Sequence, residues 1–228
     1  MSARGKHGVD PPNGPGVSGA TVPATCDHVL WGASTLDAAL EELAARTGVR
    51  AVPAGRHPEL GTHNAIVPLG RKRFLEVLAP DPTLPAGALA RRLASLPSPA
   101  LIMWAARTPS AGDVAARAQA EGYSAAVIEG HRERPDGHVV RWTNVFVSGH
   151  GAGALVPFFI EWHGRDHPAD DGPDGLRLHA LRAESPQAES LRAVLAALDV
   201  RLPVREAPVA RLVAVLDTPR GRVELAGP

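Results

Sequence analysis

The sequence of 228 residues lacks several features that would mark particular classes of protein. It has one cysteine, Cys26, which excludes an internal disulfide and any zinc site built from several cysteines. Its 24 Lys and Arg residues balance 24 Asp and Glu residues, so no excess positive charge is available to hold nucleic acid. We therefore expect a small-molecule ligand and no nucleic-acid partner.

Long apolar runs and aromatic residues are also scarce. No apolar run approaches the length that spans a bilayer, and residues 1–25, rich in Gly, Pro and Ser, lack the apolar stretch of a signal peptide. This segment predicts a flexible leader, and the chain as a whole predicts a cytoplasmic protein with no membrane partner. With 4 Phe and 1 Tyr, we expect no long aromatic platform for large planar ligands.

The remaining sequence repeats one order of elements, which is a strand, a capped helix and further strands. In the first copy, at 26–80, a strand at 27–32 precedes a helix that Ser34 is expected to cap and Gly48 to end. Strands at 49–53, 64–69 and 73–78 follow. In the second copy, at 99–164, a strand at 100–105 precedes a helix capped by Ser110, and strands at 125–129, 139–147 and 155–162 follow. A short helix at 85–96 links the two copies.

A shorter third copy follows a polar linker at 166–175. It has a strand at 176–183, a helix at 185–198 and strands at 209–216 and 222–225. Several connections are too short for parallel crossovers, so the pattern predicts an α+β fold with a mostly antiparallel sheet. We expect one domain at 26–165, built from two βαβββ modules, with a truncated third βαββ-like module at 176–228 packed on it.

Three ionisable residues lie inside apolar, strand-like runs. They are His28, Glu76 and Glu161. Burial of such groups is costly unless something pairs with them, and a divalent metal ion is a common partner. The alternative is that His28 and Glu76 pair with each other or with Arg73 and bind no metal.

Strand alternation predicts which side chains share a face. Phe74 should lie beside Glu76, and Phe159 and His163 should lie beside Glu161. Three of the four tryptophans, Trp31, Trp104 and Trp162, are expected to pack under the helices, which leaves the charged residues on the opposite, concave side. Histidines in polar stretches flanked by Gly or Pro, such as His150 and His167, are expected to be exposed.

The run from Arg56 to Asn64, Arg-His-Pro-Glu-Leu-Gly-Thr-His-Asn, combines a histidine with neutral hydrogen-bonding residues. Gly61 permits a close backbone approach, and Thr62 and Asn64 can bind a substrate through neutral hydrogen bonds. His57 can act as a general base near neutral pH. The alternative is a hairpin held by side-chain-to-backbone hydrogen bonds.

This run resembles the Arg-His-x-x-x-Gly-Thr-x-Asn pattern of the glyoxalase-like branch of the vicinal oxygen chelate superfamily. The resemblance implies that paired modules form a U-shaped sheet around a divalent metal, with ligands on the first and fourth strands of each module. His28, Glu76 and Glu161 match three of these positions, and His163 is an additional candidate ligand. The fourth position falls on Leu101, which cannot bind metal, so the chain departs from the four-ligand pattern there.

The resemblance implies a metal-dependent enzyme of the isomerase or lyase type that acts on a small oxygenated metabolite. His57 and Glu76 would be catalytic, and Thr62, Asn64, Phe74 and Phe159 would bind the substrate. A non-catalytic binding or sequestering protein of the same fold is the alternative, and an extradiol-type dioxygenase is a third, weaker one. The resemblance also leaves room for a homodimer.

Overall fold

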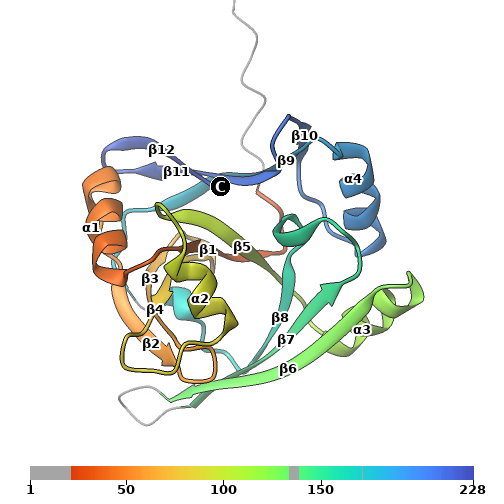
Figure 1. The fold of residues 1–228 in the computed structure, drawn as a ribbon, viewed down its shortest axis with the longest axis horizontal. Coiled ribbons are helices and arrows are strands. Elements are labelled where there is room, and N and C mark those ends of the chain that lie inside the picture. Colours follow the sequence, from red (N-terminus) through yellow and green to blue (C-terminus); the bar gives the residue numbers. More distant parts are fainter. Residues whose placement is uncertain (1–21, 134–138, 171) are drawn as a thin grey trace, which may run out of the picture.

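An eight-stranded sheet and a four-stranded sheet form the framework of the structure, a computed structural model that describes residues 22–133, 139–170 and 172–228 (Figure 1). Most of the predicted leader, residues 1–21, lies outside these ranges. No helix within them is long and apolar enough to cross a membrane.

The larger sheet is made of two modules joined side by side. The first contains β1 (Cys26–Gly32), α1 (Leu36–Thr47), β2 (Val52–His57), β3 (Thr62–Pro68) and β4 (Phe74–Pro80). The second contains β5 (Ala100–Arg107), α3 (Ala111–Ala120), β6 (Ser124–Glu133), β7 (Val139–Ser148) and β8 (Phe158–His163). The strand order is β2-β3-β4-β1-β5-β8-β7-β6, and only the β1–β4 and β5–β8 pairs within this sheet are parallel. The predicted α+β fold with two βαβββ modules is confirmed.

The third segment has the expected order of elements but a different pairing. It consists of β9 (Arg177–Ser185), α4 (Ala188–Ala197), β10 (Val204–Glu206), β11 (Arg211–Thr218) and β12 (Gly221–Ala226), in the sheet order β10-β9-β11-β12. Its first strand pairs in parallel with β10, whereas β1 pairs with the last strand of its own module. The segment is therefore a separate small sheet with the same sequence of elements. The sequence analysis missed β10, because three residues carry too little periodicity.

The main core lies between the two sheets. Trp31 and Trp104 of the larger sheet share one cluster with Leu43 of α1 and with Leu181 and Leu216 of the smaller sheet. Figure 1 shows the smaller sheet lying across the larger one, with α1 at one end and α4 at the other. The predicted placement of Trp31 and Trp104 beside the helices is confirmed.

The opposite face of the larger sheet, here called the inner face, is partly covered by α2 (Ala88–Ala94), which appears in front of β4 in Figure 1. Leu93 of α2 packs there with Leu30 and Leu78. Gly61 makes this arrangement possible, because a Cβ there would lie 2.2 Å from Pro85 O and 2.9 Å from Gly87 N. Only glycine fits at this position of the Arg56–Asn64 run.

The turn between β3 and β4 places two non-glycine residues in the left-handed region. Arg73 N–H donates to Gly70 O across 3.1 Å, and the two central residues, Arg71 and Lys72, have φ of 51° and 57°. Left-handed backbone costs a side-chain-bearing residue roughly 1–2 kcal/mol, and Asn or Gly normally fills such a turn. The sequence therefore keeps two long basic side chains here at a cost in stability.

α1 begins differently from the prediction. Thr35, not Ser34, is the residue that directly precedes the helix, and its side chain makes no capping hydrogen bond. The predicted capping box therefore does not form. Ser110, by contrast, caps α3 as predicted and accepts from Asp113 N–H at 3.2 Å.

Candidate active site

A β-bulge in β1 brings two ionisable side chains together. The register with β5 skips one residue between Cys26 and His28, so Asp27 is the extra residue. Bulges of this kind re-aim side chains beside functional sites. Here Asp27 Oδ1 lies 2.8 Å from His28 Nδ1, and Asp27 is fully buried at 0% exposure.

Asp27 is held as an anion by hydrogen-bond donors. Its Oδ2 accepts from His167 Nε2 at 3.1 Å, from Arg107 Nε at 2.8 Å and from Trp162 Nε1 at 3.2 Å. Burial by itself would raise the pKa of Asp27, but the hydrogen bonds from His167 and His28 outweigh burial and hold that pKa well below its usual range. An ionised Asp27 accepts from His28 Nδ1–H, and this orients Nε2 of the same ring toward the opposite side.

His167 is a partner that the sequence analysis placed wrongly. It was expected to be exposed, but it is only 6% exposed and its ring contacts those of Phe74 and Trp162 at 5.6 and 5.2 Å. Ala169 N–H donates to His167 Nδ1 at 3.1 Å, so the ring hydrogen lies on Nε2 and points to Asp27. The linker after β8 thus folds back as part of the site.

The other side of His28 faces a buried carboxylate. His28 Nε2 lies 3.8 Å from Glu76 Oε2, and Asn64 Nδ2 donates to Glu76 Oε1 at 2.6 Å. Glu76 and Asn64 are buried, at 9% and 8% exposure. Asn64 Oδ1 is buried and has no hydrogen-bond partner among the described residues. The expected neighbourhood of His28, Glu76 and Asn64 is present in the structure.

Aromatic side chains line the inner face next to His28. The His28 ring stacks on Phe74 with centroids 4.4 Å apart, and Phe158 meets it edge-on at 5.4 Å. Phe146 stacks on Phe158 at 5.2 Å, and Trp142 lies 5.5 Å from Trp162. We call Phe74, Phe146, Phe158, Trp142 and Trp162 the aromatic wall. Five of the nine Phe, Tyr and Trp residues are therefore gathered next to His28.

The two sets of alternating side chains in β8 are grouped as predicted, but the faces assigned to them are reversed. Ala105 of β5 pairs with both His28 and Phe158, so Phe158, Ile160 and Trp162 share the inner face with His28. Trp162 consequently lies beside Asp27 and not under the helices. A shift of one residue in a strand reverses the face of every side chain.

The remaining residues of β8 point toward the helices or the solvent. Phe159 belongs to the main core, and Glu161 Oε2 accepts from Ala111 N–H at 2.7 Å where α3 begins. His163 is exposed and lies 2.8 Å from Thr143 Oγ1 through Nε2. The structure therefore does not bring Phe159, Glu161 or His163 to His28 and Glu76.

The comparisons with known proteins agree with this architecture. A family model described as a glyoxalase-like domain matches residues 26–198, which is well over half of the chain. The chain belongs to the glyoxalase-like domain family. The glyoxalase-like part of the sequence resemblance is therefore confirmed. A comparison with curated proteins finds no match.

Solved structures similar to this glyoxalase-like protein share its fold at low identity. A hypothetical protein from Staphylococcus aureus has a TM-score of 0.60 and 14% identity, covering 88% of this chain and 84% of that one. Methylmalonyl-CoA epimerase from Mycobacterium tuberculosis has a TM-score of 0.47 and 19% identity, covering 62% and 90%. A mutant of 4-hydroxymandelate synthase from Streptomyces coelicolor has a TM-score of 0.49 and 16% identity, covering 90% and 63%. The first shows a common fold alone, and the two lower scores add nothing to it.

The predicted metal ligands of this glyoxalase-like protein do not converge, because Glu161 lies at the start of α3 and away from His28 and Glu76. Within the described ranges, no three His, Cys, Asp or Glu side chains gather so as to hold a metal ion. Leu101, at the position that departs from the family pattern, is a core residue with 2% exposure. His28 Nε2 and Glu76 Oε2 lie 3.8 Å apart, and Asn64 contacts this pair through its Nδ2, which donates to Glu76 Oε1.

The Arg56–Asn64 run has both a structural part and a part that faces the site. Arg56 Nε donates to Asp81 Oδ2 at 2.6 Å and so ties the hairpin to the segment before α2. His57 Nδ1 lies 3.1 Å from Thr62 Oγ1, and Thr62 is fully buried. The β3–β4 register puts Thr62 on the same face as Asn64. His57 is half-buried and so remains reachable from the solvent.

We expect Glu161→Gln to weaken the start of α3 and leave the His28–Glu76 centre unchanged. The charged carboxylate is a better partner than an amide for a helix N-terminus, so the free energy of unfolding should fall by about 1 kcal/mol. Urea denaturation measures this loss, with Glu121→Gln, an exposed change at the opposite end of the same helix, as the control. Loss of bound metal in the Glu161→Gln protein would contradict the structural role.

Proposed function

We propose that the chain is a glyoxalase-like enzyme of the isomerase or lyase type that acts on a small oxygenated metabolite at His28 and Glu76. One observation carries the proposal. A buried row of contacts runs from Asp27 through His28 to Glu76 and Asn64, and it places His28 Nε2 at 3.8 Å from Glu76 Oε2. If these buried polar groups served stability alone, apolar side chains of similar size would stabilise the fold as well or better.

The donor atoms present fit a divalent metal ion. His28 Nε2 and Glu76 Oε2 would hold it, and Asn64, which contacts Glu76 and whose Oδ1 has no partner among the described residues, could supply an amide oxygen. Imidazole nitrogen combined with carboxylate and amide oxygens suits a hard or borderline divalent ion. When bound, such an ion would polarise a carbonyl of the substrate as a Lewis acid.

Neighbouring residues would keep the two ligands in position. Asp27 fixes the hydrogen of His28 on Nδ1, as carboxylates do for metal-binding histidines, and Asn64 Nδ2 fixes the orientation of Glu76. His57 would remove a proton from the carbon next to the substrate carbonyl and return it elsewhere on the substrate. Its half-buried position, on the face that carries Thr62 and Asn64, supports this role.

The aromatic wall would exclude water and bind the apolar part of the substrate. Phe74 supports the His28 ring directly, and Thr62 and Asn64 remain the proposed polar contacts. Phe159 is dropped from the proposed contacts because it lies in the main core. A homodimer and a cytoplasmic location stay predictions.

The aromatic wall also favours a second function, a non-catalytic protein that binds an apolar or planar small molecule. Phe146 is 36% exposed and Ile128 is 51% exposed, so apolar surface stays open at the edge of the inner face. Such a binder needs no turnover and no metal.

Metal content and turnover separate the two functions. We expect the protein purified without chelator to contain a divalent metal, and Glu76→Gln to lose most of the metal and all turnover of an α-keto, α-hydroxy or thiohemiacetal substrate. His57→Ala should keep the metal and slow the reaction by 10²–10⁴-fold, the usual contribution of a general base. Glu161→Gln serves as the matched control, since it should keep both. Stoichiometric ligand binding without turnover, unchanged in Glu76→Gln, would establish the binding protein instead.

A further inference from the structure

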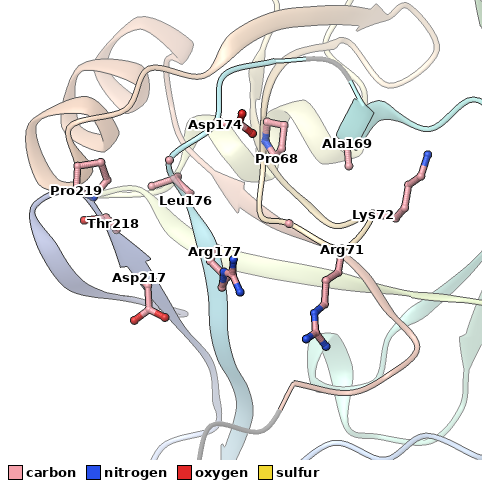
Figure 2. Close-up of a pocket in the computed structure, with 12 residues that line it drawn as sticks. Pro68, Arg71, Lys72, Ala169, Asp174, Leu176, Arg177, Asp217, Thr218 and Pro219 are labelled. Carbon is pink, nitrogen blue, oxygen red and sulfur yellow. The ribbon is translucent and has the colours of Figure 1, made fainter.

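A hollow of about 610 Å³ opens between the β3–β4 turn and the smaller sheet, and neither His28 nor Glu76 lines it. Its volume lies within the range of small-molecule sites. The lining comes from the turn itself, from the start of β9 and from the end of β11, as Figure 2 shows. The basic members are Arg71, Lys72 and Arg177, and the acidic members are Asp174 and Asp217.

Two of the basic side chains in this hollow form no ion pair with a described residue. Arg71 and Arg177 are exposed, and no described residue forms an ion pair or side-chain hydrogen bond with either guanidinium group. Lys72, in contrast, pairs with Asp170. Guanidinium groups bind planar or tetrahedral oxyanions through parallel N–H donors, so these two arginines can receive an anion.

The acidic residues of the lining do not neutralise the positive charges of both arginines. Asp217 already has Arg222 Nε at 3.0 Å and His179 Nδ1 at 3.1 Å. The hydrogen bond from Arg222, with that from His179, holds the pKa of Asp217 below its usual range, so it stays an anion satisfied by its own partners. Asp174 is then the carboxylate left to oppose Arg71 and Arg177, and Figure 2 shows it on the side of the hollow away from the two guanidinium groups.

The backbone of the turn gives an independent reason to assign a function to these side chains. Arg71 and Lys72 occupy the two central positions with positive φ, where Asn and Gly would fit with less strain. Strained residues that persist in a fold gather at binding sites. Both strained side chains line the hollow.

We propose that this hollow binds a phosphate-bearing small molecule, with Arg71 and Arg177 donating to the phosphate oxygens. A single guanidinium satisfies the two oxygens of a carboxylate, whereas two guanidinium groups on different elements suit the additional oxygens and charge of a phosphate. The site goes beyond the proposed reaction at His28 and Glu76 and does not depend on it.

Isothermal titration of the full chain with inorganic phosphate at low ionic strength tests the proposal. We expect saturable binding that weakens as sodium chloride is added, because both arginines are exposed. Arg71→Asn and Arg177→Gln should each weaken binding about tenfold, the effect of losing a charge-assisted hydrogen bond. Arg117→Gln, which changes an exposed arginine on α3, is the matched control and should bind like the wild type.

The Arg71→Asn variant also separates binding from folding. Asn relieves the left-handed backbone, so its melting temperature should equal or exceed that of the wild type while phosphate binding falls. Wild-type affinity in both arginine variants, or no binding of phosphate by any of the proteins, would overturn the proposal. Succinate that binds as tightly as phosphate would overturn the assignment of the ligand class.

Discussion

Asp27→Asn should lower the free energy of unfolding by about 3 kcal/mol and should also weaken metal binding at His28 and Glu76. The carboxylate is fully buried and accepts from His28, His167, Arg107 and Trp162. An amide of the same shape would point N–H groups at some of these donors, and losing one member of a buried charged network costs several kcal/mol. Because Arg107 keeps 40% exposure and can be solvated, we place the loss at the lower end of that range.

The same substitution should change the tautomer of His28. With an amide at position 27, the His28 ring gains by placing its hydrogen on Nε2, which removes the lone pair that a metal ion would need there. Substitutions of such supporting carboxylates lower metal affinity by about 10–100-fold. We expect a loss of this size in metal binding, measured by titration of the chelator-treated protein.

The pH dependence of stability provides a second readout. The pKa of Asp27 is lower in the folded protein than in the unfolded chain, where it is about 3.9. Its contribution is therefore complete above about pH 4 and is lost as the pH falls below that value toward the folded pKa, because the unfolded chain binds the proton first. The stability difference between the wild type and Asp27→Asn should narrow as the pH falls below 4.

The matched control is Asp199→Asn. Asp199 is exposed and has a φ of 56°, a conformation that Asn tolerates well, so the free energy of unfolding should change little. Urea denaturation of the three proteins across this pH range makes the comparison. If Asp27→Asn matched the wild type at pH 7 in stability and metal binding, Asp27 would not have the supporting role that its contacts indicate.

The sequence predicted the two βαβββ modules because the signals for their elements lie close together along the chain. Apolar runs broken by Gly and Pro and the cap at Ser110 are short-range signals, so both βαβββ modules were predictable. The proximity of His28 and Glu76 followed from the family resemblance, which placed both on ligand-bearing strands of the first module. The contact of Asn64 with Glu76 was not predicted, and it arises from the pairing of β3 with β4.

The missed residues depend on features that alternation cannot supply. Asp27 faces His28 because of a β-bulge, and His167 lies on a linker whose sequence predicts an exposed polar loop. β8 was assigned to the wrong face because both of its alternating sets contain aromatic residues, so polarity alone does not distinguish them. The parallel pairing of β5 with β8 decides the matter, and it brings together residues far apart in the sequence.

Removing residues 175–228 should leave a chain that does not fold cooperatively. The smaller sheet contributes to the same core cluster as the larger one, so truncation would expose Trp31, Leu43 and Leu101, which are now 1%, 0% and 2% exposed. Each large apolar side chain returned to water costs about 1.5–3 kcal/mol. Several together reach the whole free energy of unfolding of a typical domain, about 5–15 kcal/mol.

Polar contacts between the segments would be lost as well. Leu178 N–H donates to Leu69 O at 3.2 Å, and Arg46 and Arg220 reach across to backbone carbonyls at Glu224 and Ala45. These contacts tie the end of β3 and the helix α1 to the smaller sheet. The larger sheet therefore depends on the third segment on the face opposite to His28 and Glu76.

Solubility, dye binding to exposed apolar surface and thermal unfolding of residues 1–174 measure the effect. Two point variants of the full chain calibrate it. Leu216→Ala, at a residue with 0% exposure, should cost about 2–5 kcal/mol, whereas Val209→Ala, at 57% exposure in the same segment, should be nearly neutral. A truncated protein that stayed soluble, melted cooperatively near the wild-type temperature and bound metal unchanged would show that the smaller sheet is an appendage. Because its leucines fill the core under Trp31, we expect the opposite, with the His28–Glu76 centre lost together with the fold.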